Sequence, residues 1–157
     1  MQTGSTAYET AAVEQTGFAG RRWEWTRTVL GVVYLFGGVA HVALGLAAPE
    51  IYEEFADQAL VSAYADLWAS LVVPNLAVLQ PLVAVFELAL GAALLWWGRA
   101  VRAGHAVGAV FQAGLVLSGP WGPVNALLAV VHLAALRRSY PATVVDLVRR
   151  RTDRGPE

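Results

Sequence analysis

Polar side chains recur at seven-residue spacing inside four otherwise apolar segments of the chain. The pairs are Tyr34 and His41, Gln80 and Glu87, His105 and Gln112, and Asn125 and His132. Because seven residues is close to two helical turns of about 3.6 residues each, both members of a pair lie on one helix face. Small residues accompany these faces, and such faces pack and hydrogen-bond in membranes. We therefore expect the four faces to point into a helical bundle.

Glu87 is the strongest chemical signal, because an acid near the bilayer centre is costly unless it is neutral, paired or hydrogen-bonded. Its expected partner is His41. This pair could shuttle protons, hold a quinone head group through its carbonyl oxygens, or lock two helices together, and the sequence leaves these three interpretations open. The candidate ligand-binding or proton-relay cluster comprises Glu87, His41, Gln112, His132 and Asn125.

Other sites are less well supported by the sequence. His41, Glu87 and His132 could supply three metal ligands, but no HxxxH or ExxH spacing occurs, so we expect no metal site. His105 follows Arg102 near the inner end of its segment, and we expect it at the membrane interface. No catalytic residue can be named.

The segments that carry these residues are long and apolar. The chain is 57% hydrophobic and only 15% charged, and its charges are clustered. About 20 apolar residues cross a hydrocarbon core of about 30 Å. The sequence thus predicts an all-α integral membrane four-helix bundle over residues 23–138, with spans at about 28–48, 75–97, 101–118 and 121–137. The first span is longer than the apolar core of a signal peptide, so we expect it to be retained.

The arginines set the expected orientation. All of them precede the first span, lie between the second and third, or follow the fourth. The positive-inside rule then places both termini in the cytoplasm of a multi-pass plasma-membrane protein. Residues 1–22 are expected to be a flexible cytoplasmic tail and residues 139–157 a basic one. Within the basic tail, Arg149, Arg150 and Arg151 are expected to contact anionic lipid head groups, at about 1 kcal/mol each.

Residues 49–70 connect the first two predicted spans. Apolar residues recur every four positions, and acids supply a polar face. This pattern predicts an amphipathic helix that lies on the outer membrane surface or caps the bundle.

Composition also excludes several classes of protein. The chain has no cysteine, so thiolate metal sites and dithiol chemistry cannot come from it alone. The net charge of -1 gives no basic footprint for nucleic acid. The lipid bilayer is therefore the first expected partner.

Two stretches resemble DoxX-like membrane proteins. They are VLGVVYLFGGVAHVALGLAAPEIYEEF, with paired glycines, a histidine and a Pro-Glu step, and AVFELALGAALLWWGRAVRAGHAVGAV, with an acid, small residues and a basic turn. The resemblance covers residues 29–136. It implies a four-helix bundle with an inward acid, here Glu87, and a histidine on the first helix, here His41. Some members of that family are associated with membrane sulfur or thiol redox, including a subunit of a thiosulfate:quinone oxidoreductase.

Three functional hypotheses follow. The first is an accessory subunit of a quinone-linked membrane redox complex, with quinone as the possible ligand and a membrane or peripheral redox partner. The second is a non-catalytic scaffold that binds a partner through the outer segment or the arginine-rich tail. The third, less favoured, is a small proton-coupled carrier, for which four short helices leave little room without homo-oligomerisation. The isolated chain is not expected to be an enzyme.

Overall fold

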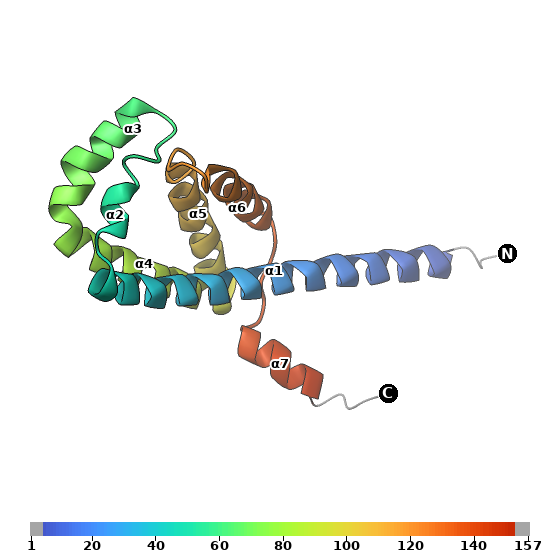
Figure 1. The fold of residues 1–157 in the computed structure, drawn as a ribbon. Coiled ribbons are helices and arrows are strands. Elements are labelled where there is room, and N and C mark those ends of the chain that lie inside the picture. The colour runs from blue at the N-terminus through green and yellow to red at the C-terminus, as the bar shows by residue number, and fades with distance from the viewer. Residues whose placement is uncertain (1–4, 153–157) are drawn as a thin grey trace.

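The structure is a computed structural model that describes the backbone of residues 5–152 and the side chains of residues 20–149. Over this range every regular element is helical. The elements are α1 (Ser5–Ala47), α2 (Ile51–Glu54), α3 (Ser62–Leu67), the π-helix η1 (Trp68–Val72), the 3-10 helix η2 (Val73–Asn75), α4 (Leu76–Leu95), α5 (Gly98–Gly114), α6 (Gly122–Ala135) and α7 (Val144–Thr152) (Figure 1). The described part of the chain is thus all-α, as the sequence predicts.

Two stretches of the described chain are long and apolar enough to cross a membrane. They are Gly20–Ala47 of α1 and the continuous helical stretch Ser62–Leu95 that ends with α4. The 14-residue helix α6 is a shorter apolar helix. Length and composition of the two long stretches agree with a membrane location.

Helix contacts follow the order of the chain from α4 onwards. α1 packs along α4, α4 contacts α5, and α5 packs against α6 (Figure 1). Small residues bring α1 and α4 together: a Cβ atom on Gly91 would lie 2.7 Å from the Gly31 carbonyl oxygen, and one on Gly38 would lie 2.8 Å from the Ala84 carbonyl oxygen. Backbones can approach this closely only where side chains are absent or small.

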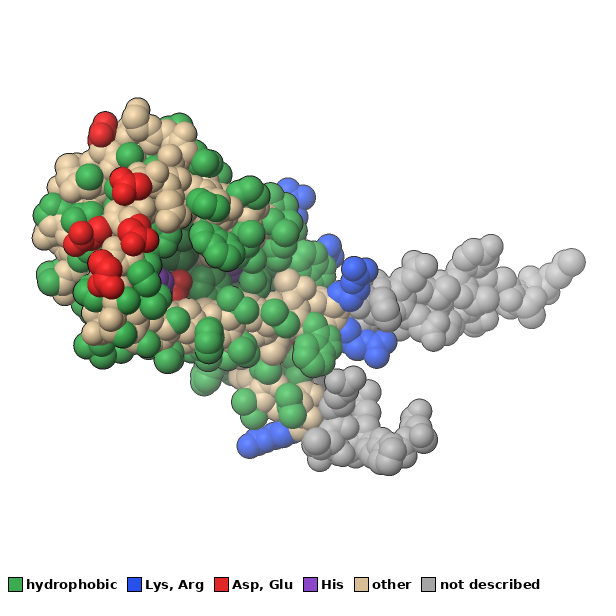
Figure 2. All heavy atoms as spheres, in the orientation of Figure 1, with side chains coloured by type: hydrophobic (Ala, Val, Ile, Leu, Met, Phe, Trp, Pro, Cys, Tyr) green, Lys and Arg blue, Asp and Glu red, His purple; other side chains and the backbone are tan. Residues whose placement is uncertain are grey.

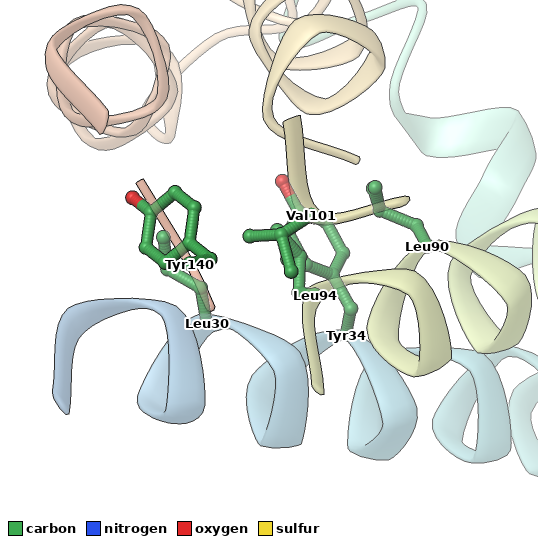
Figure 3. Close-up of a cluster of buried hydrophobic side chains, with 6 residues drawn as sticks. All are labelled: Leu30, Tyr34, Leu90, Leu94, Val101 and Tyr140. Carbon is green, nitrogen blue, oxygen red and sulfur yellow. The ribbon is translucent and has the colours of Figure 1, made fainter. Parts of the chain in front are cut away.

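A small apolar core joins these helices. It is formed by Leu30 and Tyr34 of α1, Leu90 and Leu94 of α4, Val101 of α5 and Tyr140 beyond α6 (Figure 3). Val101 and Tyr140 come from the parts of the chain that follow α4, so this core fixes α5 and the C-terminal segment against the pair formed by α1 and α4.

The outer connection differs from the predicted single amphipathic helix over 49–70. Two short helices, α2 and α3, are separated by turns, and the backbone N–H of Leu60 donates to the Leu117 carbonyl oxygen at 3.0 Å. A four-residue repeat drifts by about 40° per step around an α-helix. One straight helix therefore cannot keep the whole apolar series from Ile51 to Leu67 on one face, and the break restores the contact with the rest of the protein.

The N-terminal segment also differs from its prediction. Residues 5–22, expected as a flexible tail, are the start of the 43-residue helix α1. Alanine occurs four times and glutamate twice there, and both residues favour helix over irregular structure.

Candidate functional site

The predicted pair of Glu87 and His41 is present. His41 on α1 and Glu87 on α4 face each other, with 3.6 Å between His41 Nε2 and Glu87 Oε2. Glu87 is buried, with 8% of its surface exposed, and its Oε2 atom has no hydrogen-bond partner among the described residues. The pair is thus within ion-pair distance and leaves one buried carboxylate oxygen available.

A glycine on α1 makes room for the carboxylate. A Cβ atom on Gly37 would lie 2.5 Å from Glu87 Oε2. Any larger residue at position 37 would occupy the space of the carboxylate. The paired glycines of the first apolar segment thus serve both helix approach and the position of this acid.

The outer connection supplies a third side chain to the pair. The hydroxyl group of Tyr52 on α2 lies 2.6 Å from His41 Nδ1, and the Trp68 Nε1–H donates to the Tyr52 carbonyl oxygen at 2.6 Å. Burial raises the pKa of Tyr52, so its hydroxyl is protonated near neutral pH and can donate to Nδ1. That bond leaves the ring hydrogen of His41 on Nε2, the atom that faces Glu87.

A second contact orients the histidine from α4. The side-chain amide of Gln80 donates to the backbone carbonyl oxygen of His41. Gln80 is seven residues before Glu87, so both residues reach α1 from one face of α4.

The surface above the outer part of the site is hollowed. Figure 2 shows a hollow bordered largely by hydrophobic side chains, with an acidic and a histidine side chain visible inside it. Exposed acids gather over the neighbouring outer connection, where they comprise Glu50, Glu53, Glu54, Asp57 and Asp66. An apolar hollow with a few polar groups inside is the usual form of a small-molecule site.

A second polar group lies deeper among the helices. The side-chain amide of Gln112 donates to the Tyr34 hydroxyl oxygen at 2.8 Å, and that hydroxyl lies 3.0 Å from His132 Nε2. His132 Nδ1 in turn lies 2.9 Å from His105 Nδ1. We call Gln112, Tyr34, His132 and His105 the inner chain. Its members come from α5, α1, α6 and α5 in turn, so one hydrogen-bonded series joins three helices.

The positions of His105 and Asn125 differ from the sequence-based expectation. His105, expected at the interface, is fully buried beside His132. Asn125 was expected in the cluster, but its side-chain amide donates to the Leu115 carbonyl oxygen at 3.0 Å at the end of α5. The other four predicted residues divide between the outer pair (Glu87 and His41) and the inner chain (Gln112 and His132).

Arg27 is a buried residue that the sequence-based prediction did not single out. Its guanidinium pairs with Glu24 Oε2 at 2.5 Å and donates to the carbonyl oxygens of Leu94, Trp96 and Ala142. It also lies 5.2 Å from the ring centroid of Tyr140. The arginine therefore caps the end of α4 and ties it to the segment before α7. The seven-residue spacing could have identified Arg27, because this residue precedes Tyr34 by seven positions, as Tyr34 precedes His41.

Tyr52 was missed for a different reason. It lies outside the four apolar segments, and only the fold of the outer connection brings it to His41. The acids of that segment point to solvent, so amphipathic patterning alone gives no reason to select one tyrosine. The predicted lipid contacts Arg150 and Arg151 lie outside the described side chains, and Arg149 is exposed on α7.

The donor set does not resemble a metal centre. Among the described residues, no group of three or more His, Cys, Asp or Glu side chains could hold an ion. The outer pair instead offers an N–H donor, a carboxyl group and an apolar surround. These groups suit a small organic ligand with carbonyl or hydroxyl oxygens.

Comparisons with known proteins identify no relative. No family model matches the chain, and neither a curated protein nor a solved structure is significantly similar to it.

Proposed function

We propose that this chain is a DoxX-like integral membrane protein with four spanning helices that binds a small apolar or quinone-like ligand at Glu87 and His41. In this proposal it serves as an accessory subunit of a quinone-linked membrane redox complex, and the partner carries the electron transfer. The helix contacts from α1 to α6 and the apolar character of the two long stretches support the membrane bundle.

One observation carries the ligand proposal: the buried Glu87 Oε2 atom lacks a hydrogen-bond partner among the described residues and lies beside His41 Nε2. A distance of 3.6 Å is too long for a hydrogen bond between the two side chains. A quinone carbonyl oxygen could accept the His41 Nε2–H, and a protonated Glu87 could donate to the same head group. The hydrophobic border of the hollow would hold the apolar tail.

Mass spectrometry of bound small molecules tests this proposal. The protein is purified in mild detergent, and extracted lipoquinone is quantified per mole of protein. Glu87→Leu is expected to lower bound quinone about tenfold or more, because it removes a hydrogen bond to the head group worth about 1.4 kcal/mol or more of binding energy. Glu54→Leu is the matched control, since it makes the same exchange at an exposed acid of α2.

Two results would contradict the ligand proposal. One is wild-type protein that carries no more quinone than an unrelated membrane protein purified in parallel. The other is a Glu87→Leu variant that keeps the wild-type amount.

The exposed face of α7 favours a second candidate function, a non-catalytic scaffold. Val145 and Val148 are each 58% exposed there. A scaffold that docks a partner through this tail would lose the partner when residues 139–157 are removed, whereas Glu87→Gln would leave the interaction unchanged. Mass spectrometry of co-purifying proteins separates the two candidates.

A further inference from the structure

We propose that the inner chain is a proton path that connects Glu87 with the arginine-rich end of the protein. The proposal needs no bound ligand, so it goes beyond the ligand site described above. It also needs no continuous water-filled pore, because Tyr34, His132 and His105 pass the proton among themselves and water is required only at the two ends of this series.

His132 is hydrogen-bonded on both sides of its ring. Both of its ring nitrogens are engaged, Nε2 with the Tyr34 hydroxyl group and Nδ1 with His105. A neutral imidazole carries a hydrogen on one nitrogen and a lone pair on the other. It can therefore accept a proton on one side and release one on the other, which a residue that only holds two helices together does not require.

The hydrogen bonds of the inner chain can run in either of two directions. When Tyr34 donates to His132 Nε2, the His132 hydrogen lies on Nδ1 and is donated to His105 Nδ1, so the His105 hydrogen lies on Nε2. The opposite polarity places hydrogens on His132 Nε2 and His105 Nδ1 instead. Both arrangements fit the same heavy-atom distances, because an imidazole nitrogen and a hydroxyl oxygen can each donate or accept.

The two ends of the inner chain are His105 and Gln112. His105 Nε2 and Gln112 Oε1 are buried without a hydrogen-bond partner among the described residues. His105 is fully buried and Gln112 is 6% exposed. Buried polar atoms of this kind require a partner such as ordered water. The inner chain therefore ends at His105 Nε2 in an atom that can release a proton, whereas the Gln112 amide is not a proton carrier and holds the Tyr34 hydroxyl oxygen.

The inner chain lies between Glu87 and the end of the protein at which Arg27 is found. The Glu87 carboxylate lies over Gly37, and Gly37 is one helical turn from Tyr34 on α1. Arg27 follows two turns further along α1. From His41 to Arg27 the helix rises by about 21 Å, which is about two thirds of a hydrocarbon core.

The charged and titratable groups at the inner end come from several elements. The ring of Tyr140 lies 5.5 Å from that of His105, and Arg27 lies against Tyr140. Arg102 is one turn from His105 toward the start of α5. Arg27 is itself paired with Glu24, so the inner end of the path lies beside an ion pair and the exposed Arg102.

Each transfer along the path balances. A proton from the Glu87 carboxyl group reaches the Tyr34 oxygen through a bridging water while the Tyr34 hydroxyl proton passes to His132 Nε2. His132 then releases its Nδ1 proton to His105 Nδ1, His105 Nε2 releases its proton to a water molecule at the inner end of the path, and the Glu87 carboxylate takes up a new proton from water on the outer side. One O–H or N–H bond breaks as each new one forms, so one proton moves and no electron is exchanged.

Proton flux into liposomes tests the path. The full chain is reconstituted with an internal pH-sensitive dye, and a potassium gradient with valinomycin drives protons across the membrane. We expect wild-type protein to raise the flux clearly above that of protein-free liposomes. Tyr34→Phe should lower this protein-dependent flux about tenfold or more, because it removes only the hydroxyl group that links Gln112 to His132.

The control removes a buried hydroxyl group outside the path. Ser118→Ala deletes the hydroxyl group that donates to the Leu115 carbonyl oxygen at 2.7 Å, and its flux should equal that of wild type. His132→Phe is the second test variant, and it should also lose the flux. Size-exclusion chromatography and circular dichroism establish that each variant is folded.

Several outcomes separate this path from the ligand proposal. Wild-type flux equal to that of protein-free liposomes would overturn the path, as would wild-type flux in Tyr34→Phe or His132→Phe. Flux in a protein without bound quinone would leave the path standing and contradict the ligand proposal. Bound quinone without proton flux would overturn the path and leave the ligand proposal standing.

Discussion

Single residues in this protein are held by bonds that cross several helices. Arg27 shows this most clearly, because one guanidinium serves the end of α4, the segment before α7 and the acid Glu24. A buried arginine is stabilised only when its donors are satisfied, and backbone carbonyl groups at a helix end are acceptors that would otherwise lack a partner. The sequence assigns Arg27 to the charged boundary of a span, and the structure adds this capping role.

The pKa of Tyr140, which lies beside Arg27, leads to a prediction of how stability depends on pH. Burial, with a smaller effect from Glu24, raises its pKa from 10.0 to about 12. Its contribution to stability is therefore fully present below pH 10 and is lost as the pH rises through about 12, because the unfolded chain ionises first. A spectroscopic titration of tyrosinate should show a late transition whose amplitude falls by one tyrosine in Tyr140→Phe. A Tyr140 transition near pH 10 in folded protein would contradict this.

The helices themselves are largely predictable from the sequence, whereas the connections are not. α4 and α6 lie inside the apolar segments predicted at 75–97 and 121–137, because a run of apolar residues specifies where a helix is buried or meets lipid. The outer connection depends on long-range bonds such as that between Leu60 and Leu117, which no local pattern contains. Seven-residue spacing identified most side chains of the outer pair and the inner chain. It could not show that they form two groups, because side-chain contacts between helices depend on how far each helix is rotated about its own axis.

The contact between α1 and α4 gives a prediction at the scale of elements. Gly91→Leu should lower the free energy of unfolding by about 1–3 kcal/mol or more, because its side chain would meet the Gly31 carbonyl group and Leu35. Thermal denaturation in detergent, followed by circular dichroism, measures the effect. Ala89→Leu is the control, since residue 89 is exposed on α4. Equal stability of the two variants would count against this close helix contact.

The whole molecule is electrically asymmetric. Exposed acids lie over α2 and α3, and exposed arginines lie toward the opposite end of the described chain (Figure 2). The sequence predicts this separation because arginines and acids occupy alternate connections. An asymmetry of arginine about the apolar helices favours one orientation in the membrane.

Reporter fusions test that orientation. Alkaline phosphatase fused after residue 157 should be inactive, because the arginine-rich end is expected in the cytoplasm. The same enzyme inserted between α2 and α3 should be active, because the acidic connection is expected on the outer side. Activity at the C-terminal fusion would reverse the topology, and with it the direction assigned to the proton path.

The π-helix η1 has a consequence for how the length of this protein can vary. It lies within the unbroken 34-residue stretch Ser62–Leu95, between α3 and α4. Because each residue of a helix adds about 100° of rotation, a gain or loss of one residue there would turn α3 about its axis and carry Trp68 away from Tyr52. A residue gained or lost in the turns between α2 and α3 does not rotate a continuous helix in this way. Natural insertions and deletions should therefore accumulate in the turns, while the length of η1 stays constant.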